Sequence, residues 1–183
     1  LGSTERRQAM NGDPIFHANV YPRSLPSGIP GRISRGNPTI ESGDPDESKP
    51  FTAYGMPVKK VAGRVVPIEA GDAADVVFGF LVESFPTSDT RLVTRGVLSG
   101  SVPVAYSPHA VLRRGYMHVL ANGGAAYETA DGGQVYVRIA NPMPGMPIGG
   151  IEALSSPDVV AIPRAFFKGR RDQAKNVEIE YNI

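Results

Sequence analysis

The most regular feature of this sequence is an alternation of apolar and polar side chains with a period of two. In the stretch QVYVRIA one face of an extended chain carries Val135, Val137 and Ile139. The opposite face carries Gln134, Tyr136 and Arg138. This pattern is typical of a half-buried strand, so we predict a strand here.

The last residues, NVEIEYNI, repeat the alternation. The apolar positions are Val177, Ile179, Tyr181 and Ile183, and the polar positions between them are Glu178, Glu180 and Asn182. A slip of one residue would turn both glutamates into the core, so the pattern fixes the register of this strand. We therefore expect the C-terminus to be a docked strand.

Further stretches read as strands and are separated by glycine-containing turns. They are GRVVPIE (63–69), DVVFGFLVESF (75–85), VLRRGYMHVLA (111–121) and DVVAIPRAFF (158–167). The unbroken apolar run around Gly79 predicts a strand that is buried on both faces and bent at the glycine. Short strands that recur roughly every 8–12 residues with such turns between them predict an all-β, antiparallel body. We expect this body, a sandwich or a β-barrel, over residues 58–183.

Residues 1–57 differ in kind, because prolines recur every few positions and exclude both helix and central strand. We predict an extended, loop-rich N-terminal arm. Apolar side chains nevertheless recur through it: Ile15, Phe16, Val20, Tyr21, Leu25, Ile29, Ile33 and Ile40. A solvated linker carries fewer, so these side chains lie either on the protein's own barrel or on a partner, and the sequence leaves both open.

Composition narrows the class of protein. A length of 183 residues fits one domain plus an arm, and 41% hydrophobic residues are too many for a disordered chain. The formal net charge is +1, from 19 basic and 18 acidic side chains, so we expect no direct contact with nucleic acid and none with a membrane. No stretch approaches the roughly 20 apolar residues of a spanning helix, which predicts a soluble chain.

The usual signatures of catalysis and metal binding are missing from the sequence. His17, His109 and His118 lack the spacing that places two imidazoles on one metal, and the chain has no cysteine. The pattern G-x-S-x-G does not occur either. We therefore expect neither an enzyme nor a bound metal or cofactor.

In the order and extent of its segments, the sequence resembles the structural cement proteins of tailed-bacteriophage capsids. The matching stretches are LPSGIPGRISRG, TIESG and TAYGMPVKK, then VVPIEAGDAADVVFGFLVESFPT, VLRRGYMHV, GGQVYVRIANPMPGMPIGGIEA and IPRAFFKGRRDQAKNVEIEYNI. They cover most of the chain from about residue 20 onward, and residues 1–14 have no counterpart.

The resemblance implies a small β-barrel or jelly-roll-like body without enzymatic activity. It implies a decoration protein, made in the cytoplasm of the bacterial host, that binds the outer surface of the virion's capsid and bridges neighbouring subunits of the major capsid protein. It also implies a homo-oligomer, a dimer or a trimer, on the shell.

With this partner, we expect contacts from apolar side chains of the arm, from its polar rim and from two arginines of the body. The candidates are Tyr21, Leu25, Ile29 and Ile33, the rim residues Arg32 and Arg35, and Arg113 and Arg114 as salt-bridge partners. The loop NPMPGMPIGG (141–150) is either a preset contact surface bearing methionines or a lid on the barrel end.

An alternative from another class is a sugar-binding or receptor-binding β-domain of a virion. The absence of tryptophan and of a paired-carboxylate motif counts against it. Carboxylates that face one another across strands would not be visible in the sequence.

Overall fold

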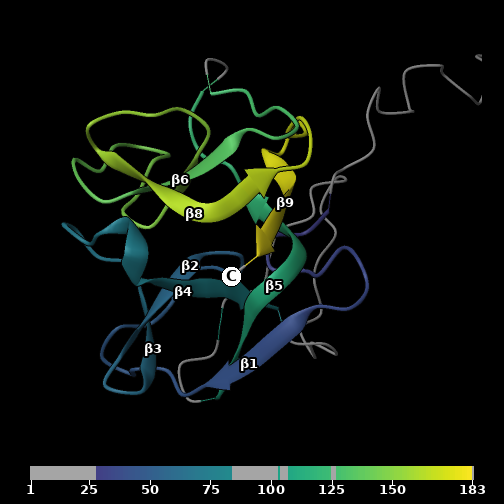
Figure 1. Ribbon diagram of the computed structural model, residues 1–183. Helices are drawn as coiled ribbons and strands as arrows, with labels where there is room; N and C mark the ends of the chain where they lie inside the picture. The colour runs from purple at the N-terminus through teal and green to yellow at the C-terminus, as the bar shows by residue number, and fades with distance from the viewer. Residues whose placement is uncertain (1–27, 84–102, 104–106, 125–126, 183) are drawn as a thin grey trace, which may run out of the picture.

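The structure, a computed structural model, describes residues 28–83, 103, 107–124 and 127–182. Its strands are β1 (Thr39–Gly43), β2 (Pro57–Val61), β3 (Arg64–Pro67), β4 (Val77–Val82), β5 (His109–Leu120), β6 (Gln134–Arg138), β7 (Ile151–Glu152), β8 (Val159–Phe167) and β9 (Asn176–Asn182). A 3-10 helix, η1 (Ala74–Val76), precedes β4. The strands form one nine-stranded antiparallel sheet in the order β3-β2-β4-β5-β9-β8-β6-β7, with β1 on β5 (Figure 1). The all-β, antiparallel prediction is confirmed.

Strand β5 joins the two parts of this sheet. Near its start, Leu112 pairs with Phe80 of β4 on one side and with Ile40 of β1 on the other. From Arg114 onward β9 takes the place of β4 beside β5, while Arg114 still pairs with Thr39 of β1. Gly115, with φ of 137°, lies at the change of partner, where β5 curves from the lower part of the sheet (β1–β4) into the upper part (β6–β9) (Figure 1).

Both ends of the sheet curl back onto the chain, which gives a half-barrel. At the β3 end, Val65 donates its N–H to the carbonyl of Asp44 at 2.8 Å and accepts from the N–H of Asp46 at 3.3 Å. At the β7 end, Asn122 donates its N–H to the carbonyl of Ile151 at 2.7 Å. These bonds cover the outer edges of β3 and β7, which would otherwise offer unpaired backbone groups to other chains.

The side chains of β4 and β5 enter two separate cores. Phe80 and Leu112 belong to the larger core, which joins side chains of β4 and β5 to those of β6–β9. The ring of Phe80 meets that of Tyr181 edge to face at 5.0 Å. Leu81 and Val111, on the opposite faces of the same strands, belong to a smaller core. The smaller core is completed by Phe51, Val58 and Val65. The prediction that the run around Gly79 is buried on both faces is confirmed.

The C-terminal strand follows the predicted alternation. Val177, Ile179 and Tyr181 of β9 are buried in the larger core, whereas Glu178 and Glu180 are partly exposed. Ile183 lies outside the described residues. In β6, Val135 and Val137 are buried as expected. Among the described residues no helix is long and apolar enough to cross a bilayer.

Gly79 provides a test of the close packing between β4 and β5. A Cβ atom at this position would collide with the carbonyl oxygen of Leu112 and the side chain of Val111. We expect Gly79→Ala to lower the free energy of unfolding by about 1–3 kcal/mol, because backbone must move to admit the methyl group. Gly36→Ala, which places its methyl in open space, is the matched control. Equal urea midpoints for the two variants would contradict this packing.

Candidate interaction surfaces

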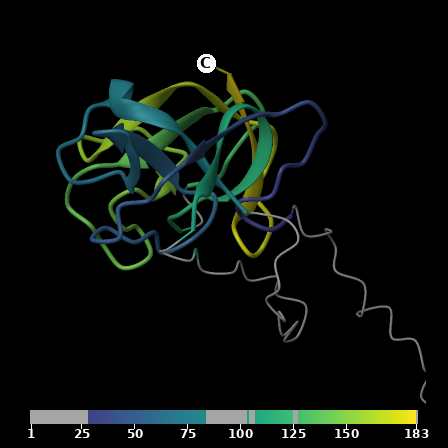
Figure 2. The same cartoon turned by 90° about the horizontal axis from the view of Figure 1, so that it is seen from below.

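The chain from residue 28 to residue 56, called here the N-terminal segment, runs along the edge of β5. His118 donates its N–H to the carbonyl of Arg32 at 2.9 Å and accepts from Gly31 at 2.8 Å. Ser34 donates its N–H to Tyr116 at 3.0 Å, and β1 continues the pairing. Figure 2 shows the start of this segment, in purple, beside β5 and β9. Part of the predicted arm, within the N-terminal segment, is therefore paired with the sheet.

Polar side chains hold the start of the segment. The Nε of Arg32 lies 2.8 Å from a carboxylate oxygen of Glu83. Arg35 contacts Glu178 of β9 at 2.5 Å, and Ser34 donates its hydroxyl to the same carboxylate at 2.6 Å. The guanidinium of Arg35 also lies over the ring of Tyr116, 4.2 Å from its centroid. The predicted rim residues Arg32 and Arg35 therefore have partners within this chain.

Apolar side chains of the segment also pack on the body. Ile29 is 7% exposed, and Ile33 is half-buried against the larger core. Phe51 enters the smaller core, where its ring meets that of His109 edge to face at 5.4 Å. Of the two alternatives for these apolar side chains, the protein's own body is the surface for Ile29, Ile33 and Phe51. The candidates Tyr21 and Leu25 lie outside the described residues.

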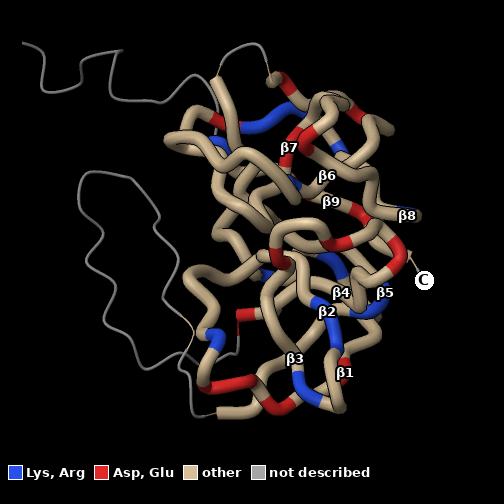
Figure 3. Tube along the Cα trace, turned by 90° about the vertical axis from the view of Figure 1, so that its left-hand side faces the viewer, with Lys and Arg blue, Asp and Glu red and all other residues tan. Residues whose placement is uncertain are grey.

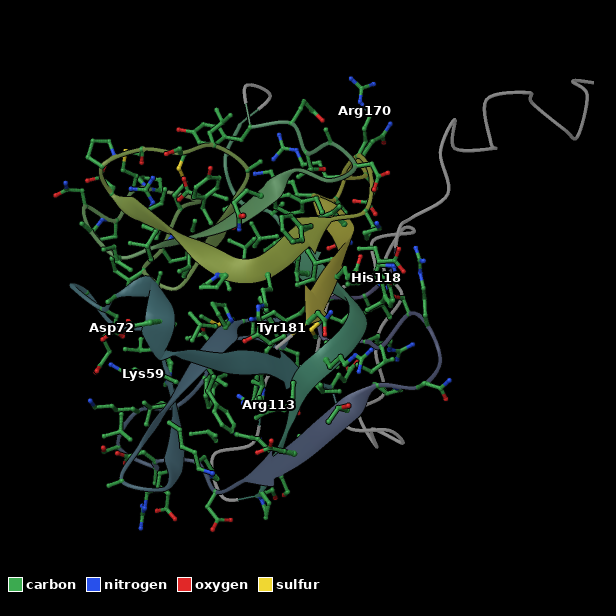
Figure 4. All side chains as sticks on the ribbon, viewed as in Figure 1. Lys59, Asp72, Arg113, His118, Arg170 and Tyr181 are labelled. Carbon is green, nitrogen blue, oxygen red and sulfur yellow. The ribbon has the colours of Figure 1, made fainter. Side chains whose placement is uncertain are left out.

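A lysine network holds the later part of the segment. Lys49 of the segment contacts Glu69 at 2.7 Å, and Lys59 of β2 contacts Glu69 and Asp72 at 2.8 Å each. Figure 4 shows Lys59 and Asp72 side by side at the edge of the lower part. Hydrogen bonds from Lys49 and Lys59 lower the pKa of Glu69 to about 2. Hydrogen bonds from Arg35 and Ser34 lower the pKa of Glu178 despite its partial burial.

The adjacent arginines of β5 have different surroundings. Arg113 lies over the ring of Phe78 at 3.6 Å, donates to the carbonyl of the same residue and contacts Glu41 at 3.2 Å. Arg114 is exposed and, among the residues described, makes no ion pair. It lines a shallow hollow of about 300 Å³ whose other side chains include Asn37, Thr39, Glu180 and Asn182. Of the predicted salt-bridge residues, Arg114 is thus the one that faces an open hollow.

A buried ion pair lies beneath the loop after β6. Arg138, the last residue of β6, is 1% exposed, and its guanidinium contacts the fully buried carboxylate of Glu152 in β7 at 2.5 and 3.0 Å. Hydrogen bonding to Glu152 raises the pKa of Arg138, so the guanidinium stays charged. The alternation placed Arg138 on the polar face of its strand, but it did not reveal that the loop covers this face.

The loop over this ion pair comprises residues 141–148 and is called here the Met/Pro loop. Arg138 donates to the carbonyls of Ala140 and Asn141 at 3.2 and 3.0 Å, and to the sulfur of Met146 at 3.4 Å. Met143 and Met146 exchange backbone hydrogen bonds of 3.1 and 2.8 Å. Met146 is 8% exposed, whereas Met143 is 47% exposed. The loop therefore covers the ion pair with one methionine and exposes the other to solvent.

The charged side chains of the described residues show neither a metal site nor a one-sided charge. Within the described ranges, no group of three or more His, Asp or Glu side chains is placed to hold a metal ion. Lys and Arg are interspersed with Asp and Glu along the trace (Figure 3), in keeping with the balanced net charge. These features define an all-β protein whose described surface carries an anchored N-terminal segment, the hollow beside Arg114 and the Met/Pro loop.

Comparison with known proteins identifies the family. The sequence profile of the family described as structural cement protein (E217 gp24/Pam3 gp6) matches residues 16–182. The chain belongs to this family of phage structural cement proteins, which makes it a structural protein of a phage capsid. The family membership expected from the sequence resemblance is confirmed.

A solved structure has a similar fold. It is a chain from the capsid of Myoviridae phage XM1, with a TM-score of 0.63 and 15% sequence identity. The alignment covers 92% of this chain and 98% of the other. The likeness therefore extends over nearly the whole of both chains. A search of curated proteins gave no significant match.

The buried ion pair predicts a marked difference between a single and a double substitution. Arg138→Met leaves the carboxylate of Glu152 buried without its partner, which we expect to cost about 3–5 kcal/mol of unfolding free energy. The double variant Arg138→Met/Glu152→Met removes both charges and should recover most of that loss. Urea titration of the three proteins measures this. An equal loss in both variants would show that the pair does not act as a unit.

Acidification should weaken the anchors of the N-terminal segment. The pKa of Glu69, about 2 in the folded protein against 4.5 ordinarily, is lowered on folding, and that of Glu178 is lowered too. Their contribution is therefore complete above about pH 4.5 and is lost as the pH falls toward 2. Urea midpoints measured across this range should fall with pH. The fall should be shallower in Glu69→Gln, and an identical slope in that variant would contradict the assignment.

Proposed function

We propose that this protein is a capsid cement or decoration protein that binds the outer surface of the shell and bridges neighbouring subunits of the major capsid protein. Membership of the structural cement protein family carries the proposal, because the family profile spans both the N-terminal segment and the body. The protein would be made in the bacterial host cytoplasm and act in the virion as a homo-oligomer, a dimer or a trimer.

The anchoring of the N-terminal segment supports two different roles for the candidate contact residues. Ile29, Arg32, Ile33, Arg35 and Arg113 have partners within the chain. We infer that these side chains contribute to bridging chiefly by holding the surface in place. Direct contact with the shell is assigned to Tyr21 and Leu25, which precede the anchored segment, and to Arg114.

The physical advantage of this arrangement is preorganisation. A segment already paired along β5 loses little further conformational entropy when a partner binds it. Contacts from the arm and from the body to adjacent subunits are also multivalent, so individually weak contacts give slow release from a lattice. A shell bound in this way is stabilised because the protein binds the assembled lattice and not the separated subunits.

Binding to empty shells assembled from the phage's own major capsid protein tests the proposal. The protein should cosediment with these shells and raise their melting temperature. Arg114→Glu should bind more weakly than wild type, whereas Arg64→Glu, an exposed cation in the lower part of the sheet, should bind normally. An unchanged shell melting temperature at saturating protein would refute the proposal. Binding on a glycan array without binding to shells would favour the sugar-binding alternative.

A further inference from the structure

The Met/Pro loop exposes an uncharged, apolar tip. Residues 142–148, PMPGMPI, contain no charged side chain and no side chain with an N–H or O–H donor. The four residues from Pro142 to Gly145 are exposed, with Met143 the large apolar side chain among them. A single exposed apolar residue is ordinary on a protein surface, but a whole exposed turn without polar side chains is not explained by solubility.

The loop is also held in one conformation. Arg138 donates to the carbonyl of Asn141, to that of Ala140 just before the loop, and to the sulfur of Met146. The backbone bonds between Met143 and Met146 close the turn. The side-chain amide of Asn141 donates to Asp158 at 2.6 Å, which ties the base of the loop to the residue before β8. The prolines restrict the remaining backbone freedom.

The buried arginine indicates that the shape of the loop matters. A buried ion pair is often no more stabilising than apolar side chains of similar volume, since both charges lose their hydration. An apolar side chain in place of Arg138 could not bind the carbonyls of Ala140 and Asn141 or join them to Glu152. What Arg138 adds is therefore a fixed position for the tip around Met143.

We propose that the Met/Pro loop is a preorganised docking element that inserts Met143, flanked by Pro142 and Pro144, into an uncharged apolar pocket of a neighbouring major capsid protein subunit. This inference rests on the proposed function. The tip carries no charge, so an apolar pocket complements it, whereas a charged pocket would lose hydration without gaining a partner. Methionine suits such a contact because its unbranched side chain adapts to irregular surroundings.

The partner is a different protein and not a second copy of this chain. The hollow beside Arg114 is lined by charged, amide and hydroxyl side chains, including Asn37, Glu180 and Asn182, and does not match an apolar tip. The other large apolar side chains that the described residues expose come from separate elements or turns, one from each: Ile40, Val61, Val76, Leu120, Leu154 and Phe166. The capsid shell is the surface that family membership places beside this protein.

Substitution of Met143 tests the inference on empty shells with the full-length protein. We expect Met143→Asp to weaken shell binding by about tenfold or more, as the loss of a central apolar contact does in other interfaces. Met143→Leu should bind within about twofold of wild type, because it keeps the apolar volume. The matched control is Val61→Asp, which puts the same charge at a site that is 51% exposed in the lower part of the sheet. This control should bind as wild type does.

The melting temperature of each isolated variant shows whether the body is intact. If Met143→Asp lowers it, Met143→Ala, which adds no charge, takes its place with the same expected loss of binding. The double variant Arg138→Met/Glu152→Met, folded but without the hydrogen bonds to the loop, should also bind more weakly than wild type.

The outcomes separate this inference from the proposed function. Wild-type affinity in the charged or truncated Met143 variant would overturn the docking role of the loop while shell binding by the wild type stands. Failure of the wild type itself to bind shells would overturn the proposed function. If Met143→Asp abolishes self-association of the isolated protein but leaves shell binding unchanged, the occupant is a second copy and the inference is wrong.

Discussion

The fold depends on one pair of strands that serves two hydrophobic cores. Phe80 of β4 and Leu112 of β5 face the larger core, while Leu81 and Val111 face the smaller one. Because the two cores share these strands, neither can form fully unless β4 and β5 are paired. The rest of the molecule is attached to this pair, since β5 carries the N-terminal segment on one edge and β9 on the other. Burial at the shared strands therefore positions the surfaces on which the proposed function depends.

Much of this architecture follows from side-chain alternation. A strand covered on both faces must be apolar throughout, and the run around Gly79 showed this directly. The strand β9 was equally clear, since a slip of one residue would turn its glutamates into the core. The burial of Arg138 in an ion pair could not be predicted from side-chain alternation. Its partner Glu152 lies in the two-residue strand β7, which is too short to have a pattern of its own, and the covering loop has no periodicity.

The N-terminal segment was harder to predict, because proline content specifies extended chain but not the surface beneath it. Ile29 and Phe51 are buried within this protein, whereas Ile40 is exposed, and nothing in the local sequence distinguishes them. Pro45 shows how such a segment can still join a sheet. Its neighbours Asp44 and Asp46 make the bonds to Val65, so the missing N–H of the proline leaves no gap. The assignment to a phage capsid came from the family resemblance, because no single residue of the sequence indicates it.

The contact between Ser34 and Glu178 spans 144 positions of the chain, which has a consequence for biosynthesis. A ribosome adding roughly 5–20 residues per second needs on the order of ten seconds to travel that distance. During this interval the N-terminal segment with its apolar side chains has been synthesised, but β9, whose Glu178 binds Ser34 and Arg35, has not. Prolines in the segment then protect against aggregation, because they keep a nascent, unpaired stretch from pairing with the strands of other polypeptides.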